Sequence, residues 1–592
     1  MFFYKKLRFY RIKNAQKDTL FFFLHRIIEK YRDICMVCQD LIYSNDYADY
    51  IIDTTSIRGR ELSGNAVCSQ QINQEYAVIQ VPREEKEEEM RDFLNYQNIP
   101  RLFGLLELSH LEETGVTQLQ RNPNFDLLGQ NVVLGVIDTG IDYQHPAFIN
   151  PDGTSRIGIL WDQSIPSEKP DEEFPYGSIY RRDRMNEALE SENPLEIVPS
   201  VDTEGHGTFL TGVAAGSRIE DGDFQGIAPL CDIAVVKLKQ AKEYLRRFWL
   251  IPSDVTAFQE TDLFLAVRFI QTYAYEQQKP FVILLGCGTN SGNHGESDYM
   301  KDYLNHISTF SGRSIVLAAG NEGSLGHHYR GNGLDNREFQ DIEIQIAEGE
   351  QGFTAEFWAD APDSYTVGFL SPSGEYVEKI PVSISGEGVD AGFIFEPTTI
   401  TVFYEPVERT SGDFLIWIRM EEPSPGIWKI RVFKENVLNG RYDLWLPMER
   451  FLKPDTRFLN PDPYTTICEP GNGSGPMTVT AYDHRSDTLF FQAGRGYTRD
   501  ERIKPDFAAP GVNVYGPALN GRYRNGTGTS VSAAITAGCA LLLLSYRPYY
   551  TGLQLKNLLI KGTERNQLVY PNREWGYGRI DIYNSLVSLS GL

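Results

Sequence analysis

Cysteine is scarce in this chain of 592 residues, and its placement follows no regular spacing. The seven cysteines stand at positions 35, 38, 68, 231, 287, 468 and 539. Their odd number and scattered positions, several inside apolar runs, argue against the disulfide framework of a secreted protein. Cys35 and Cys38 form a single CxxC motif without a second pair at zinc spacing, which disfavours a metal or redox role for them.

Long apolar runs and an excess of positive charge are also missing. The longest apolar run, residues 537–544, is far shorter than the roughly 20 residues that span a membrane. The formal net charge of −24 argues against nucleic acid as a partner. No signal peptide or transmembrane segment is visible, so the sequence leaves the compartment open.

Positive charge is concentrated at the N-terminus of this otherwise acidic chain. Residues 1–32 contain nine Lys and Arg against Asp18 and Glu29, a formal charge of +7. Their apolar core, LFFFL at residues 20–24, is too short and too late for a secretory signal. Two interpretations stay open. Residues 1–35 form a basic helix on a membrane or partner, or they are not translated and the protein starts at Met36.

A glycine-rich stretch at residues 524–534, RNGTGTSVSAA, runs almost directly into the apolar AGCALLLL of residues 537–544. Ser530 is preceded by small residues and followed by a predicted buried helix. This arrangement favours an exposed nucleophile at a helix N-terminus, where free N–H groups face a developing negative charge. Turns of Gly, Ser and Thr also cap ordinary helices, so this stretch alone does not establish catalysis.

Two further motifs supply groups that activate a serine. Residues 132–142, VVLGVIDTGID, predict a buried strand ending at Asp138, where α/β sheets carry their active sites. Residues 202–216, DTEGHGTFLTGVAAG, place His206 between glycines just before a predicted helix of small residues. Each residue taken alone also suits a turn or loop position. Together with Ser530 they follow the order Asp, His, Ser of subtilisin.

On its Asp-Thr-Gly, His-Gly-Thr and Gly-Thr-Ser motifs the sequence resembles the subtilisin-like serine proteases, or subtilases. The resemblance implies an α/β fold with a doubly wound parallel sheet, and serine endopeptidase activity. It assigns Ser530 as the nucleophile, His206 as general base and acid, and Asp138 as the group that orients the imidazole. It also assigns Asn321, in SIVLAAGNEG, as the oxyanion donor beside the Ser530 backbone N–H.

The resemblance also identifies the walls of the substrate cleft. Residues 281–292, FVILLGCGTNSG, match the subtilase segment that pairs with the substrate backbone. The familiar Ser-Leu-Gly is replaced here by Gly286, Cys287 and Gly288. The other wall of the primary specificity pocket is expected to consist of Ala318, Ala319 and Gly320. Neither wall contributes a charged residue, which predicts modest selectivity for apolar side chains.

A small upstream unit resembles the propeptide of subtilases, an intramolecular chaperone and inhibitor. It combines a predicted strand at 76–81, a charged helix at 84–96 and the extended segment IPRLFGLLEL at 99–108. By analogy its last strand lies in the active-site cleft, and self-cleavage falls between Phe103 and Ser109. The alternative is an ordinary N-terminal extension that stays attached.

From residue 132 onward predicted strands and helices alternate, as in a doubly wound α/β domain. Strands are predicted at residues 132–138, 232–238, 281–286, 314–320 and 477–483, and helices at 207–216, 255–277 and 530–545. The acidic segment 153–200 is expected to be a surface excursion around Trp161.

Residues 336–463 interrupt this alternation with short predicted strands in which apolar and polar residues alternate. The pattern predicts an inserted all-β sandwich or jelly roll, with its aromatic residues in the core rather than on a sugar-binding platform. These aromatic residues are Phe357, Trp358, Trp417, Trp428 and Trp445. The insert narrows the resemblance to the Csp-type germination subtilases of clostridia. The predicted domains are the basic extension 1–35, the propeptide-like domain 36–107, the catalytic domain 108–335 and 464–592, and the insert 336–463.

Three classes of function follow from these motifs. An active endopeptidase, with a protein substrate and its own propeptide as bound inhibitor, is favoured because all four catalytic positions are intact. The germination subgroup suggests activation of a hydrolase precursor in the bacterial cytoplasm or spore, and proteolysis for nutrition or of host proteins is the alternative. The other two classes are a pseudoprotease scaffold and a binding module that acts through its β insert.

We predict that the protein needs no cofactor and no bound metal. Where many subtilases carry a calcium-binding aspartate after the first motif, this chain reads HPAF at residues 145–148, without a carboxylate ligand. A rigid insert could brace the fold in place of calcium. A chelator is therefore expected to leave the thermal unfolding midpoint unchanged in calorimetry, and a fall of many degrees would contradict this expectation.

Overall fold

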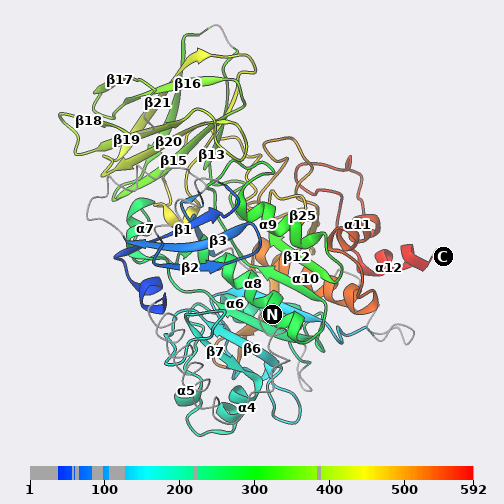
Figure 1. Cartoon of the computed structure of the whole chain (residues 1–592). Coiled ribbons are helices and arrows are strands. Elements are labelled where there is room, and N and C mark those ends of the chain that lie inside the picture. Colours follow the sequence, from blue (N-terminus) through cyan, green and yellow to red (C-terminus); the bar gives the residue numbers. More distant parts are fainter. Residues whose placement is uncertain are drawn as a thin grey trace.

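A computed structural model of the chain describes residues 38–56, 59, 66–82, 98–105, 127–218, 224–334, 337–382 and 388–590. The basic extension 1–35 and the helix predicted at 84–96 lie outside these residues. The described residues form a central sheet flanked by helices, a small N-terminal sheet beside it, and a two-sheet β unit at one end of the molecule (Figure 1).

The central sheet has nine strands in the order β25-β24-β12-β10-β5-β8-β6-β7, with β26 paired to β24. The strands from β24 to β6 run parallel, while β25 and β7 pair antiparallel at the edges. Continuous apolar runs such as VLGVID suit a parallel sheet that is buried on both faces. The strands are β5 (Val133–Asp138), β6 (Ile157–Asp162), β7 (Ser178–Arg181), β8 (Asp232–Lys237), β10 (Phe281–Leu285), β12 (Arg313–Ala318), β24 (Met477–Asp483), β25 (Thr488–Leu489) and β26 (Phe507–Pro510).

Helices cover both faces of this sheet, as the doubly wound α/β prediction requires. Helices α6 and α10 share a hydrophobic core with Leu134 and Val136, whereas α8 and α9 share the core of the opposite face with Val133 and Ile137. The helices are α4 (Arg182–Glu190), α5 (Pro194–Ile197), α6 (His206–Ala215), α7 (Glu243–Phe248), α8 (Glu260–Glu276), α9 (Tyr299–Ser308), α10 (Thr529–Tyr546), α11 (Gly552–Gly562) and α12 (Ile582–Ser590). Among the described helices only α10 has the length and apolar composition to cross a membrane, and 89% of it is buried inside the protein.

The segment 153–200 is not a surface excursion, so this expectation was wrong. It contributes β6 and β7 to the central sheet, and β6 pairs in parallel with β8. Trp161 in β6 is completely buried and contacts the rings of Phe174, Tyr176 and Phe269. The acidic residues and prolines lie mainly in the loop between β6 and β7 and in the segment 182–200 that follows β7. Composition averaged over the whole segment therefore concealed a buried strand.

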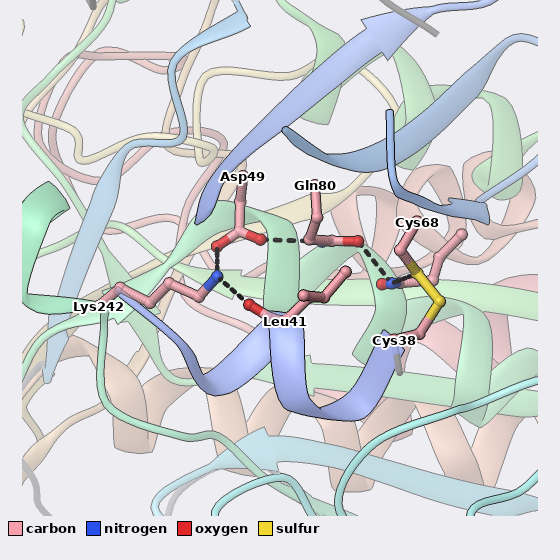
Figure 2. Close-up of a disulfide and its surroundings, with 7 residues drawn as sticks. Cys38, Leu41, Asp49, Cys68, Gln80 and Lys242 are labelled. Atoms are coloured by element: carbon pink, nitrogen blue, oxygen red, sulfur yellow. Dashed lines mark hydrogen bonds and ion pairs between the residues drawn. A yellow bond between two sulfur atoms is a disulfide. The ribbon is translucent and has the colours of Figure 1, made fainter. Parts of the chain in front are cut away.

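The N-terminal unit is an antiparallel sheet in the order β1-β3-β2, with a disulfide between Cys38 and Cys68 (Figure 2). Cysteine spacing did not predict this bond, because one member of the CxxC motif pairs with a residue 30 positions away. Asp49 of β1 forms an ion pair with Lys242 at 3.0 Å, which attaches the unit to the α/β part that was predicted to be catalytic, here called the catalytic part. Within the unit, Asp49 also accepts a hydrogen bond from Gln80 of β3 at 2.8 Å. The strands are β1 (Tyr47–Asp53), β2 (Cys68–Gln71) and β3 (Tyr76–Pro82).

Two smaller sheets border the central sheet. One has the order β11-β4-β9, and the other is the hairpin of β27 and β28, which leads into α10. Their strands are β4 (Leu102–Leu105), β9 (Phe258–Gln259), β11 (Cys287–Gly288), β27 (Val512–Ala518) and β28 (Arg522–Thr527).

The inserted unit consists of two antiparallel sheets that share one hydrophobic core. The first has the order β13-β22-β15-β20-β19-β18, and the second has the order β17-β16-β21-β14-β23. The insert is thus a β-sandwich, whereas its assignment as a jelly roll and the domain boundaries stay predictions. The strands are β13 (His328–Asn332), β14 (Phe339–Ile346), β15 (Gly352–Ala359), β16 (Ser364–Leu370), β17 (Tyr376–Ile380), β18 (Val389–Gly392), β19 (Thr399–Glu405), β20 (Phe414–Glu421), β21 (Gly426–Asn436), β22 (Arg441–Trp445) and β23 (Arg457–Phe458).

The five aromatic residues of the insert are all buried, but they divide between two cores. Phe357 and Trp428 lie inside the sandwich, as expected. Trp358, Trp417 and Trp445 instead belong to the core of the catalytic part, where Trp417 stacks on a phenylalanine of α7 at 4.8 Å between ring centroids. Adjacent residues of a strand point to opposite faces, so Phe357 and Trp358 do not share a core. Trp358, Trp417 and Trp445 therefore join the insert to the catalytic part.

We predict that Trp161→Ala destabilises the catalytic part, because it removes a completely buried side chain from the central sheet. The expected loss is about 3–5 kcal/mol of unfolding free energy, measured by urea unfolding followed by circular dichroism. The control Tyr549→Ala truncates a side chain that is 83% exposed, and it is expected to change the unfolding free energy by less than about 0.5 kcal/mol. An unchanged urea midpoint for Trp161→Ala would contradict the placement of β6.

Candidate active site

Asp138 and His206, far apart in the sequence, form a buried hydrogen-bonded pair. Asp138 is the last residue of β5, and His206 is the first residue of α6. The Nδ1–H of His206 donates to Oδ1 of Asp138 at 2.7 Å, and the backbone N–H of Thr139 donates to the same oxygen at 2.8 Å. This geometry fixes the tautomer of the imidazole and directs Nε2 away from the carboxylate, as a general base requires.

Side chains around the first turn of α6 hold His206 in this position. Asp202 accepts hydrogen bonds from the backbone N–H of Thr208 at 3.0 Å and from its hydroxyl at 2.6 Å. The hydroxyl of Thr139 accepts from the backbone N–H of Gly207 at 3.0 Å. These acceptors satisfy N–H groups that a helix start leaves unpaired. Sequence reasoning missed Asp202, although an Asp shortly before a predicted helix is a recognisable capping signal.

Gly286 leaves the space that the Asp138–His206 pair occupies. It follows β10, the neighbour of β5 in the central sheet. A Cβ atom at Gly286 would lie 2.5 Å from Oδ2 of Asp138 and 3.0 Å from Cε1 of His206. A residue with a side chain would therefore displace one member of the pair.

Asn321 contacts the N-terminus of α10 at Thr529, the residue before Ser530. Ser530 is the second residue of this helix, but it is buried, so the expectation of an exposed nucleophile was wrong. The backbone N–H of Thr529 donates to Oδ1 of Asn321 at 3.2 Å, and its hydroxyl donates to the same oxygen at 3.1 Å. The amide oxygen of Asn321 is held in this way, and its NH₂ group is the end that can donate to an anion. Sequence reasoning missed Thr529, whose role follows from its side chain rather than from its position before Ser530.

Two buried thiols lie at the predicted walls of the specificity pocket: Cys287 within one wall, and Cys468 against the other. The wall residues Ala318, Ala319 and Gly320 lead from the end of β12 directly to Asn321. Cys468, which the sequence reasoning did not single out, lies against Gly320, where a Cβ atom would come within 2.3 Å of its Sγ. Burial and the charge of Asp138 raise the pKa of the Cys287 thiol, and burial and the charge of Glu322 raise that of Cys468. Both cysteines are therefore neutral, small and apolar.

The segment that was predicted to end the propeptide lies beside this wall. β4 pairs antiparallel with β11, with Leu105 opposite Cys287, and its other edge pairs with β9. An extended segment between two strands is a common way for a protein to bind a peptide backbone. Along this pairing the step from Gly104 to Leu105 runs from Gly288 to Cys287, in the direction of Gly286, which lies against the Asp138–His206 pair.

The HPAF segment makes protein contacts instead of offering metal ligands. Nε2 of His145 donates to the backbone carbonyl of Arg522 at 2.9 Å, and its Nδ1 accepts from the backbone N–H of Ala147 at 3.1 Å. Burial lowers the pKa of His145, which favours the neutral ring. Within the part of the chain that the structure describes, no group of three or more His, Cys, Asp or Glu could hold a metal ion. Independence from metal stays a prediction.

Comparison with known protein families matches this chain to the Subtilase family over residues 129–373 and 459–578. Among curated proteins, the serine protease AprX of Bacillus subtilis (strain 168) is 31% identical over 141 residues, 20% of this chain and 32% of the relative. The PII-type proteinase of Lacticaseibacillus paracasei is 23% identical over 531 residues, 79% of this chain and 26% of the relative. The chain therefore spans about a third or less of the length of these curated relatives.

A solved structure is similar over most of its length. The CspB protease of Clostridium perfringens is 29% identical in sequence and superposes with a TM-score of 0.71. The match covers 80% of this chain and 95% of the CspB chain. The fold, including a parallel sheet with helices on both faces, is thus shared with this protease.

We predict that Gly286→Ala disrupts the Asp138–His206 pair, because the added methyl group would meet both side chains. The rate at which a fluorophosphonate labels Ser530 is expected to fall by about 100-fold, the size of effect that a 1 Å misplacement produces. Mass spectrometry of the labelled protein measures this rate. The matched control is Gly392→Ala, where a Cβ atom meets nothing within 4 Å. Equal labelling rates in both variants and the wild type would contradict the assignment of Gly286.

Proposed function

The chain belongs to the Subtilase family, and on this premise we propose that it is a serine endopeptidase that uses Asp138, His206 and Ser530. The observation that carries the proposal is the buried 2.7 Å hydrogen bond between Nδ1 of His206 and Oδ1 of Asp138. It presents the second ring nitrogen for proton transfer, and Ser530 lies at the N-terminus of α10. All three residue types of the triad are present, which favours an enzyme over a pseudoprotease scaffold.

In this proposal Oγ of Ser530 attacks the carbonyl carbon of a peptide bond, and Nε2 of His206 accepts the hydroxyl proton. Asp138 stabilises the imidazolium, which then gives the proton to the leaving amine. The NH₂ group of Asn321 and the backbone N–H of Ser530 stabilise the oxyanion. Loss of one such donor typically lowers kcat by about 10²–10³-fold. A water molecule then hydrolyses the acyl-enzyme by the same proton transfers in reverse order.

The proposal extends to self-processing. Gly104 and Leu105 pair with β11 as a substrate backbone would, and the direction of this pairing leads toward the catalytic pair. Cleavage just after this segment, within the predicted range from Phe103 to Ser109, would separate the N-terminal sheet from the catalytic part. The cleaved unit would remain a bound inhibitor, because Phe103 is completely buried and Asp49 is paired with Lys242.

The likeness to the CspB protease supports a related physiological role. On the resemblance to the Csp-type germination subtilases, we propose that the enzyme activates the precursor of a spore-germination hydrolase. The β insert, which is joined to the catalytic part by Trp358, Trp417 and Trp445, would hold the cleft rigid in this role.

We predict that Ser530→Ala abolishes both self-processing and peptide cleavage, because it removes the nucleophile. N-terminal sequencing of the wild type is expected to give a new start shortly after Leu105, whereas Ser530→Ala keeps the translated start. Cleavage of a casein substrate is expected to fall by at least about 10³-fold. The control Ser486→Ala changes an exposed serine and should behave as the wild type. The same new N-terminus in Ser530→Ala would show that another protease makes the cut.

A further inference from the structure

Arg101 is a buried arginine that directly precedes β4, the strand that pairs with β11. Its guanidinium contacts two carboxylates: Nε lies 3.1 Å from Oε1 of Glu260, which Nη2 also contacts, and Nη1 lies 3.0 Å from Oδ2 of Asp298. Nη1 also donates to the carbonyl of Ser291 at 3.4 Å. The side chains of Arg101 and Glu260 are each 4% exposed, and that of Asp298 is 2% exposed. An arginine held by two buried carboxylates occupies a specific pocket rather than a surface ion pair.

The pocket is formed by two helix starts and a glycine. Glu260 is the first residue of α8, and Asp298 is the N-cap residue of α9. Gly292 forms the floor: a Cβ atom there would lie 3.0 Å from Nη1 of Arg101, and its φ of +132° disfavours any other residue. The loop between β11 and α9 is therefore shaped to admit a guanidinium group.

Without Arg101 the charges of this pocket do not balance. Three buried carboxylates, those of Glu260, Asp298 and Glu469, would face the single ammonium group of Lys301, which binds Glu469 at 2.7 Å and Asp298 at 3.2 Å. Among the described residues, Oε2 of Glu469 has no hydrogen-bond partner. Burial would raise the pKa of Asp298, but the charges of Arg101 and Lys301 hold it well below its ordinary value. The carboxylates of this pocket therefore need a second cation beside Lys301 to remain ionised.

The position of Arg101 relative to the cleft is defined by backbone pairing. Gly104 lies opposite Gly288, and Arg101 stands three residues before Gly104. The backbone N–H of Glu260 donates to the carbonyl of Arg101 at 2.9 Å, and the N–H of Arg101 donates to Oε2 of Glu260 at 3.2 Å. Glu260 thus binds both the backbone and the side chain of Arg101.

The residues that form the pocket and the arginine that fills it lie on opposite sides of the proposed cut. Glu260, Gly292, Asp298, Lys301 and Glu469 all follow it in the sequence, and Arg101 precedes it. When the N-terminal unit leaves, the carboxylates stay with the enzyme. The vacated pocket would then be open to the side chain of another extended peptide in the same cleft.

We propose that Glu260 and Asp298 form a specificity subsite that binds an arginine side chain of the substrate, three residues before the residue that pairs with Gly288. This inference rests on the proposed endopeptidase function and adds its substrate class: extended peptides with a basic residue well upstream of the cleaved bond. Arginine fits better than lysine, because its planar fork reaches both carboxylates at once. The subsite makes the enzyme selective for charge in addition to the apolar residues near the bond.

Peptide cleavage by the wild-type protein tests this subsite directly. The substrate is the chain's own segment 98–109, NIPRLFGLLELS, with a fluorophore and a quencher at its ends. Matched peptides carry Arg101→Lys, Arg101→Gln or Arg101→Glu. We expect kcat/KM to fall in that order, with the arginine peptide about 10- to 100-fold better than the glutamine peptide.

Variants of the enzyme then test whether Glu260 and Asp298 cause this selectivity. Glu260→Gln removes one charge at constant size, and we expect the arginine-to-glutamine ratio of kcat/KM to fall to about 3 or less. Asp298→Asn, which keeps the N-cap of α9, tests the second carboxylate and serves if Glu260→Gln does not fold. The matched control is Glu276→Gln at the other end of α8, whose side chain is 44% exposed and pairs with Arg181. It should leave the ratio unchanged.

The outcomes separate this inference from the function on which it depends. If none of the peptides is cleaved even after the processed N-terminal unit has been removed from the protein, the proposed endopeptidase function is overturned, and the subsite with it. If the arginine and glutamine peptides are cleaved with equal kcat/KM by the wild type, the protein is an endopeptidase, but the pocket only anchors the N-terminal unit. An unchanged ratio in both Glu260→Gln and Asp298→Asn would likewise overturn the subsite.

Discussion

The hydrogen bond between His206 and Asp138 is buried, and much of the surrounding structure keeps it away from water. A buried carboxylate is costly unless donors satisfy it. Here the donors are the imidazole and the Thr139 N–H, and both are held by fixed elements. β5 ends inside the molecule, α6 starts beside it, and Gly286 leaves room for both side chains. The parallel sheet brings these parts together because its strands end at a common edge.

A second buried charge system surrounds Arg101, at the other end of the segment in which β4 pairs with β11. There the carboxylates of Glu260 and Asp298 are neutralised by Arg101, which directly precedes β4. The two systems differ in how their charge is satisfied. The donors to Asp138 belong to the catalytic part itself, whereas the acidic pocket depends on a cation from an extended peptide. The backbone pairing between β4 and β11 connects the two ends.

Short motifs in the sequence predicted much of this site. The strand that ends at Asp138, the helix just after His206 and the glycine-rich turn before Ser530 were each predicted from short motifs. The structure has them as β5, α6, which already includes His206, and the start of α10. Segment-wide composition was a poorer guide. The acidic residues of 153–200 concealed the buried β6, and the assumption of one aromatic core failed because Phe357 and Trp358 point to opposite faces. The roles proposed for the site residues stay predictions.

The amino-acid sequence alone determined which segments become strands and helices, and which of them carry reactive side chains, because hydrophobic periodicity and turn residues act over a few neighbours. Only the tertiary structure decided which distant residues meet. Three contacts join residues up to 208 positions apart in the sequence. They are the disulfide between Cys38 and Cys68, the hydrogen bond between Thr529 and Asn321, and the ion pairs of Arg101 with Glu260 and Asp298. Such contacts depend on how the layers pack, and no local pattern in the chain encodes that arrangement.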